Sequence, residues 1–285
     1  MDDRDKVGVP LCVHIHGAGK VGRTFAHGLR EVGWCVSLTA ARHGRPDRVD
    51  ADVVVLAVRD GQLAMEAGAW VGVVASHAVV LHVAGVWTPE VLSVLRGSCR
   101  GVGQLHPLVS VASHRMSPSL EGAYALVAKN VEAVEVACRM AAALGMVPQR
   151  GDGWDRVGYH AAAWLVAGGA AALCGAARDI MSGSGIDPRS AERMLGSLLL
   201  SVGSNVSRVG LPEGLTGVVR RGDVATLRKH VEVVSRLAPG HVALYLASAR
   251  AQVAMARALG DVASEVLDEL ECAIGAMTVA RAGEV

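Results

Sequence analysis

The chain has 285 residues, a net charge of +1 and an aromatic content of 3%. A length of this order accommodates two domains, each with its own hydrophobic core. The near-neutral charge and the scarcity of aromatic rings argue against a partner nucleic acid or an acidic membrane, because these partners need basic patches and base stacking also needs aromatic side chains.

Six cysteines are spread along the chain without a CxxC spacing, so we expect no bound metal. Most stand in apolar runs and are expected to be buried small side chains of a reducing, cytoplasmic protein. His14 and His16 alternate along the first predicted strand and are interpreted as structural, since two ligands do not make a metal site. No signal peptide is expected, because the first residues are acidic and polar.

The first half of the chain alternates apolar runs with helical segments, which predicts an α/β fold with a doubly wound, Rossmann-type sheet. Its Val-rich runs are typical of parallel strands that are buried on both faces. Strands are predicted at Leu11–Ile15, Cys35–Thr39, Val53–Val58, Val79–Val83, Gly101–Leu105, Ala123–Val127 and Met146–Gln149. Helices are predicted at Val21–Val32, Asp60–Ala69, Thr88–Leu95 and Val131–Leu144.

After Gly151 the pattern changes to long helices, which places a domain boundary between a cofactor domain (1–151) and an all-α domain (152–285). The helices are predicted at about 155–182, 187–208, 223–237, 241–259 and 262–279. Asp187, which precedes a proline, and Asp223 are expected to cap two of them. The stretch 159–177 contains no charged residue but is rich in Ala and Gly, so we expect a helix buried in a helical domain and no membrane span.

A glycine-rich turn follows the first predicted strand and precedes a predicted helix. Gly17-Ala18-Gly19-Lys20-Val21-Gly22 has the GxGxxG pattern of dinucleotide-binding folds. There the first glycine permits a tight turn, the second lets the backbone approach a pyrophosphate, and the third lets the helix pack on the strand. The helix N-terminus then offers N–H groups to the phosphates. The alternative is a glycine-rich turn in another kind of α/β protein.

The end of the second strand indicates which dinucleotide binds. An NAD site needs an Asp or Glu roughly 20 residues beyond the first glycine, to accept a hydrogen bond from the ribose 2′-hydroxyl. The stretch from Gly33 to Arg45 contains no acid, and Arg42 and Arg45 stand near its end. A guanidinium suits the 2′-phosphate, so we expect NADP(H). The alternative is that both arginines are solvated loop residues.

Ligands of open α/β sheets bind beyond the carboxyl ends of the strands. Val58 and Arg59 follow the third strand and His82 lies in the fourth, and all three are expected to border the cofactor. His106, after the fifth strand, is the candidate proton donor, with an imidazole pKa near neutral. A histidine that holds the strand end is the alternative.

The helical domain supplies the other candidates. His160 and Asn205 are candidate catalytic residues, and Thr216 and Arg221 are candidate substrate residues, since a guanidinium can hold a carboxylate through two hydrogen bonds. The alternatives are a hydrogen-bonded core histidine at position 160, a bond between helices at Asn205, and a surface ion pair of Arg221 with Asp223.

Four motifs together carry a resemblance over nearly the whole chain: Gly17–Gly22, Leu105-His106-Pro107-Leu108, Tyr159-His160-Ala161-Ala162-Ala163, and Leu215-Thr216-Gly217 with Arg221-Gly222-Asp223. The chain resembles two-domain proteins that join a Rossmann-like NADP-binding domain to a helical domain of unknown function. It is similar in architecture to ketopantoate reductases, prephenate dehydrogenases and pyrroline-5-carboxylate reductases. The resemblance implies a helical domain like the C-terminal domain of 6-phosphogluconate dehydrogenase. It also implies a catalytic role for His106, which matches the His-Pro step of prephenate dehydrogenases.

Four residues at three places depart from the pattern of that family. Ala84 replaces a serine, the pair Ala167-Gly168 replaces Ser-Asn, and Val218 replaces a proline. A hydroxyl and an amide that could bond a substrate carbonyl are thereby missing.

The leading hypothesis is an NADPH-dependent reductase of a small 2-oxo acid, such as ketopantoate, or of a cyclic imine. The alternatives are an NADP(H)-binding protein without catalysis and an enzyme that uses another dinucleotide, such as a deazaflavin. A homodimer through the helical domain is expected, because the helices from Val242 to Val279 are more apolar than a small domain needs.

Overall fold

The computed structural model describes residues 9–113 and 118–282. The chain forms two compact units, Met1–Leu165 and Val166–Val285. The division lies inside the long helix α4 (Arg156–Gly183), whereas the change in sequence pattern lies just before that helix begins.

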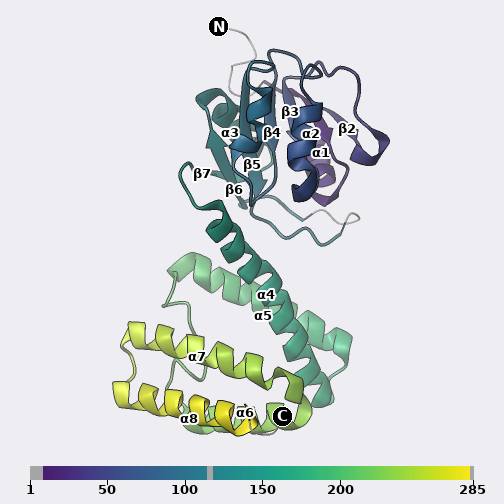
Figure 1. Ribbon diagram of the computed structural model, residues 1–285. Coiled ribbons are helices and arrows are strands. Elements are labelled where there is room, and N and C mark those ends of the chain that lie inside the picture. The colour runs from purple at the N-terminus through teal and green to yellow at the C-terminus, as the bar shows by residue number, and fades with distance from the viewer. Residues whose placement is uncertain (1–8, 114–117, 283–285) are drawn as a thin grey trace. The chain divides into compact units, whose positions relative to one another are not determined.

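The first unit is built on a seven-stranded sheet with the order β2-β1-β3-β4-β5-β6-β7 (Figure 1). Its strands are β1 (Cys12–His16), β2 (Cys35–Thr39), β3 (Val53–Leu56), β4 (Val79–His82), β5 (Gly101–Pro107), β6 (Tyr124–Lys129) and β7 (Val147–Arg150). The first five run parallel, β6 is antiparallel to β5, and β7 is parallel to β6. The predicted Rossmann-type sheet is confirmed, and the antiparallel β6 is a feature that apolar runs alone do not reveal.

The helices of this unit are α1 (Lys20–Glu31), α2 (Leu63–Ala69) and α3 (Val131–Ala143), with 3-10 segments η2 (Ala41–His43), η3 (Asp60–Gln62) and η4 (Pro89–Leu95). The prediction of an α-helix at Thr88–Leu95 is wrong, because this segment winds as a 3-10 helix with Pro89 at its start. Short connecting segments commonly take this tighter winding.

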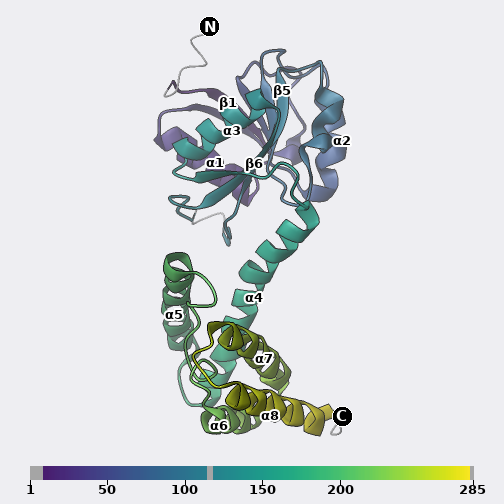
Figure 2. The ribbon, with the colours of Figure 1, turned by 90° about the vertical axis from the view of Figure 1, so that its left-hand side faces the viewer.

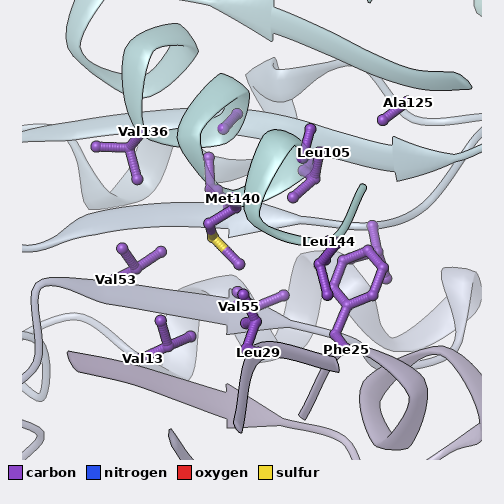
Figure 3. Packing of buried hydrophobic residues seen from close by; sticks show 14 of the residues in the cluster. Val13, Phe25, Leu29, Val53, Val55, Leu105, Ala125, Val136, Met140 and Leu144 are labelled. Atoms are coloured by element: carbon purple, nitrogen blue, oxygen red, sulfur yellow. The ribbon is translucent and has the colours of Figure 1, made fainter. Parts of the chain in front are cut away.

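Side chains alternate between two apolar layers, because successive residues of a strand point to opposite faces of the sheet. Val53 and Val55 of β3 pack with α1 and α3, whereas Val54 and Leu56 pack with α2 and η4. Figure 2 shows α1 and α3 on one face of the sheet and α2 on the other. On the first face Met140 lies over β3 and Phe25 close to Leu144 (Figure 3). Both faces are thus covered, as the Val-rich strands predict.

The second unit contains the rest of α4 and the helices α5 (Pro188–Val209), α6 (Val224–Leu237), α7 (Val242–Leu259) and α8 (Ser264–Ala282), with the 3-10 segment η5 (Pro239–His241). Asp187 accepts a hydrogen bond from Ser190 N at 2.9 Å, and Asp223 accepts one from Thr226 N at 2.9 Å, so both predicted caps are confirmed. The core of this unit joins α6, α7 and α8 through residues such as Leu227, Val253 and Leu270.

Helices α4 and α5 bury few of their side chains. Only 6% of the most apolar window of α4 is buried, and Ala191 is the one buried residue of α5 among the described residues. The expectation that 159–177 is a buried helix is therefore wrong within a single chain. By length and composition alone, α4 is the one helix in the described ranges that is long and apolar enough to cross a membrane.

Candidate functional site

The glycine loop between β1 and α1 has the shape that a dinucleotide pyrophosphate needs. Gly17 has a φ of +117°, and a Cβ there would lie 2.2 Å from the carbonyl oxygen of Ala57. A Cβ on Gly22 would lie 2.0 Å from the carbonyl oxygen of Gly17, so only glycine lets α1 pack this closely. A Cβ on Gly19, by contrast, would have no protein atom within 4 Å. The backbone at Gly19 therefore faces open space, where a phosphate can approach.

This open space belongs to a groove of about 650 Å³ at the carboxyl ends of β1, β2 and β3. Its lining residues come from the glycine loop, from the turn after β2 and from the segment after β3: Gly17, Ala18, Gly19, Arg23, Ala40, Ala41, Arg42, Ala57, Val58, Arg59, Gln62 and Glu66. A dinucleotide is expected at this position, because β2 lies on one side of β1 and β3 on the other, so the strand order reverses here.

The groove carries more positive than negative charge. Arg42 and Arg59, both predicted from the sequence, line it together with Arg23, which the sequence analysis missed. Arg23 donates to the carbonyl oxygen of Ala18 at 2.9 Å and so supports the glycine loop. Open space at Gly19 and three guanidinium groups fit a dinucleotide with several phosphates. The residues present thus fit NADP(H), which they would hold by its phosphates.

Several predicted cofactor residues lie outside this lining. Lys20 and Val21 begin α1, and Arg45 is an exposed residue of the turn after β2. His82 is 0% exposed, so its side chain faces the interior and does not line the groove. Glu66 is the acid that the groove does contain; it arrives from α2, and its Oε2 lies 3.3 Å from Nε2 of the buried His16.

A second group of polar residues, the histidine cluster (His82, His106 and His160), gathers beyond β4 and β5. His82 ends β4, and His106 lies near the end of β5. Both therefore lie at the carboxyl edge of the sheet, the same edge that carries the groove. Nδ1 of His106 forms a hydrogen bond of 3.1 Å with the hydroxyl of Tyr159, and the two rings meet edge to face at 5.6 Å. Tyr159 and His160, near the start of α4, thus lie beside His106, and all three residues belong to the first unit.

Gly85 lies between two of these imidazoles. A Cβ on Gly85 would lie 2.7 Å from Nε2 of His106 and 2.8 Å from Cδ2 of His160. Real Cβ atoms do not approach other heavy atoms so closely, so both rings can take these positions only because residue 85 is a glycine. The sequence analysis noted Ala84 beside this glycine but missed Gly85 itself, whose signal is its place directly after the fourth strand.

The electrostatics of the cluster differ from the sequence expectation. Burial, aided by His160 and by the guanidinium of Arg156, lowers the pKa of His106 to about 4. Burial alone is the main cause that lowers the pKa of His82 to about 3. The expected near-neutral pKa of His106 is therefore wrong, because the ring is enclosed beside a cation rather than held at a wet strand end. Both imidazoles are neutral at pH 7.

The buried histidines predict a loss of stability in mild acid. In the unfolded chain each imidazole binds a proton near pH 6.5, whereas in the folded chain His82 and His106 remain neutral to pH 4 or below. The unfolded state therefore binds more protons between these values, and the free energy of unfolding falls as the pH is lowered from 6.5 towards 4, by about 3 kcal/mol for each ring. Urea unfolding at pH 7.5 and 5.0 measures the first part of this decrease, about 2 kcal/mol for each ring.

The substitution His82→Leu is expected to make the free energy of unfolding less dependent on pH in this range. His77→Gln, at an exposed side chain, is the control and should leave the wild-type dependence in place. Equal pH dependence in the wild type and in His82→Leu would contradict the assignment.

The remaining candidates, Asn205, Thr216 and Arg221, belong to the second unit. Asn205 is half-buried on α5, and Thr216 and Arg221 are exposed. Among the described residues no ion pair joins Arg221 to Asp223, which instead caps α6. The neighbouring Arg220 holds the loop before α6, because it donates to the carbonyl oxygens of Glu213 and Leu215 at 2.6 and 2.7 Å.

Comparison with known proteins places this architecture. Residues 123–252, just under half of the chain, match a family model described as a domain of unknown function (DUF2520). No curated protein matches the chain by sequence.

Three solved structures show the same fold at low sequence identity. An NADP oxidoreductase from Bacteroides fragilis is 15% identical, with a TM-score of 0.67 over 85% of this chain and 98% of that one. A pyrroline-5-carboxylate reductase from Coxiella burnetii is 17% identical, with a TM-score of 0.55 over 88% and 99%. An imine reductase from Streptomyces aurantiacus is 15% identical, with a TM-score of 0.51 over 91% and 93%. The chain thus has the Rossmann-like fold, with its helical C-terminal part, that NADP-dependent reductases have.

Proposed function

We propose that this protein, whose residues 123–252 match the family of unknown function, is an NADPH-dependent reductase of a small cyclic imine. One observation carries the proposal: an arginine-lined groove at the glycine loop and an enclosed histidine cluster follow each other along one carboxyl edge of the sheet. The groove over β2, β1 and β3 suits the adenosine and pyrophosphate of the cofactor. Its nicotinamide would then extend towards β4 and β5, where the cluster lies.

The neutral state of the cluster favours an imine over a 2-oxo acid. Reduction of a carbonyl needs a proton for the developing alkoxide, and a histidine with a pKa of about 4 is a poor general acid at pH 7. Burial also raises the pKa of Tyr159, so its phenol is no better as an acid. A protonated imine arrives with its proton already bound, so hydride transfer completes its reduction to an amine. The ketopantoate-like 2-oxo acid thus becomes the second choice.

The cofactor supplies the hydride when it is bound. His106 can then hold the substrate nitrogen: in the tautomer that donates Nδ1–H to the oxygen of Tyr159, Nε2 carries a lone pair that accepts a hydrogen bond from an iminium N–H. A neutral ring suits this role, because an imidazolium would repel the iminium.

The test is the consumption of NADPH, followed at 340 nm, with cyclic imines with and without a carboxylate and with 2-oxo acids including ketopantoate. Turnover with imines, and a rate that falls as the imine loses its proton at high pH, is the expected result. Turnover with 2-oxo acids alone would contradict the imine assignment. Arg42→Ala is expected to raise the KM for NADPH but not for NADH, because only NADPH carries the 2′-phosphate.

The alternative is a protein that binds NADP(H) without catalysis. It is favoured by Ala84, which is 6% exposed and has its carbonyl oxygen bound to Gln104, so the strand end has no hydroxyl to offer a substrate. Binding of NADPH without turnover of either substrate class would support this alternative. Absence of NADPH binding would contradict both functions.

We also propose a homodimer, formed through α4 and α5. The surface expected for the dimer, Val242–Val279, does not suit this role, because α7 and α8 bury their apolar residues against α6. The large exposed apolar residues instead crowd α5, where they include Leu198, at 60% exposed, and Leu200, at 79%. From Met194 to Ser207 the helix has no charged side chain. A second copy presents the same uncharged face, and two such faces cover each other about a two-fold axis.

Leu198→Asp is expected to convert the dimer into a monomer, because it places a charge in the centre of this face at a cost of at least tenfold in the association constant. Arg208→Glu, near the end of the same helix, is the control and should remain a dimer. Size-exclusion chromatography with light scattering measures both. A monomeric wild-type protein would contradict the proposal, and its flotation with lipid vesicles would assign the face to a membrane.

A further inference from the structure

Two cysteines lie side by side at the amino edge of the sheet. Cys12 is the first residue of β1 and Cys35 the first of β2, and the parallel register pairs their Cα atoms. Both are exposed, so the expectation of buried cysteines is wrong at these positions. The reason is their place, since β2 is the edge strand and both residues stand where their strands begin.

Their side chains point to the same side of the sheet. Two residues further along each strand, Nδ1 of His14 and the hydroxyl of Ser37 form a hydrogen bond of 2.8 Å, and the next pair in this row, His16 with Thr39, is joined at 3.0 Å. Residues two apart on a strand share a face, so Cys12 and Cys35 begin the same row. The two thiols are therefore neighbours at the start of this row.

The strand spacing allows a covalent bond between them. Neighbouring strands lie about 4.8 Å apart, and disulfides join Cα atoms about 4.4–6.8 Å apart. Because the two residues are paired in the register and share a face, closure needs rotation of the two side chains and no movement of the backbone towards a distant partner. The spacing is nevertheless near the short end of the range, which predicts a strained bond that is readily reduced.

We propose that Cys12 and Cys35 are a redox pair that closes to an intramolecular disulfide in the presence of a low-molecular-weight disulfide such as oxidised glutathione. The thiolate of one cysteine attacks the oxidant, forms a mixed disulfide and releases one glutathione. The thiolate of the other attacks the protein sulfur of that mixed disulfide, so the protein bond forms and the second glutathione leaves. Two protein thiols are oxidised and one glutathione disulfide is reduced to two thiols.

The surroundings set the rate of this exchange. Partial desolvation, then the neighbouring Cys35 and the carboxylates of Asp52 and Asp50, raise the pKa of Cys12. Less of its thiol is therefore ionised at neutral pH, and the exchange accelerates as the pH rises. The bond would tie the edge strand β2 to β1, and these two strands carry Arg42 and the glycine loop at their other ends.

Peptide mapping by mass spectrometry tests the pair in the full-length chain without substrate or cofactor. After incubation with oxidised glutathione at pH 8, the Cys12 and Cys35 peptides are expected to be joined in most molecules, with the loss of two hydrogen atoms, and to separate again in dithiothreitol. Cys12→Ser is expected to leave Cys35 as a mixed disulfide with glutathione. Cys272→Ser, which removes another exposed thiol, should leave the cross-link intact.

Two results would overturn the proposal. One is a wild-type protein in which Cys12 or Cys35 carries glutathione and no cross-link forms. The other is a protein in which both remain thiols while Cys272 is modified. Neither result depends on NADPH binding, so this experiment tests the redox pair independently of the proposed reductase activity.

Discussion

The substitution Gly19→Ala is expected to weaken NADPH binding by at least tenfold while the protein stays folded. Gly19 has a φ of −75°, and an added Cβ would meet no protein atom within 4 Å, so the backbone accepts alanine. The methyl group would project into the groove at the point where the pyrophosphate must approach the backbone. Titration of NADPH fluorescence measures the Kd, and thermal unfolding measures the stability of the same variant.

Two matched variants separate binding from folding. Gly17→Ala is expected to lower both, because its φ of +117° is strained for alanine and its Cβ would lie 2.2 Å from the Ala57 carbonyl oxygen. Gly68→Ala, in α2, also has open space at its Cβ and should leave the Kd unchanged, while its stability should rise slightly because alanine favours the helix. If the Gly19→Ala protein bound NADPH with the wild-type Kd, the glycine loop would not be part of the NADPH-binding site.

The substitution Gly85→Ala is expected to lower kcat by ten- to a hundredfold and to leave the Kd for NADPH unchanged. The new methyl group would lie 2.7 Å from Nε2 of His106 and 2.8 Å from His160, so both rings must move away from their positions. Displacements of this size at a reacting centre have effects of this order. The assay is the imine-dependent consumption of NADPH, with the positions of the histidine ring signals in NMR spectra as a measure that needs no turnover.

Gly61→Ala is the control for this experiment, since its Cβ would meet nothing within 4 Å. Tyr159→Phe removes the 3.1 Å hydrogen bond to His106 without adding volume, so a smaller loss of kcat is expected from it. If Gly85→Ala shifted the ring signals but kept the wild-type kcat, the histidine cluster would have no part in the reaction.

Local patterns predicted most of the elements because each depends on neighbours in sequence. The strand Cys35–Thr39 agrees residue by residue, and helix caps at Asp187 and Asp223 were readable from the residue type and the helix that follows. The glycine loop was equally readable, since φ and Cβ space are properties of a few adjacent residues. The antiparallel direction of β6 was not readable, because an apolar run has the same composition in either direction.

The candidate site was predicted less completely than the fold. The sequence analysis named His106 and His160 but not Gly85, Tyr159 as a partner, or Arg156, which is 5% exposed and helps to keep His106 neutral. Glu66 escaped because it enters the groove from α2 rather than from the end of β2. These relations join residues far apart in the chain, and no local pattern encodes them.

The amino-acid sequence alone was enough to identify a Rossmann-type α/β protein with a helical second half and a glycine loop of the dinucleotide-binding pattern. Periodicity, capping residues and glycine act over a few residues, so they are visible in one dimension. The neutrality of His106, the exposure of α5 and the pairing of Cys12 with Cys35 became visible only in the folded chain. Burial, strand register and the field of distant charges arise when segments come together, because each is set by neighbours in space.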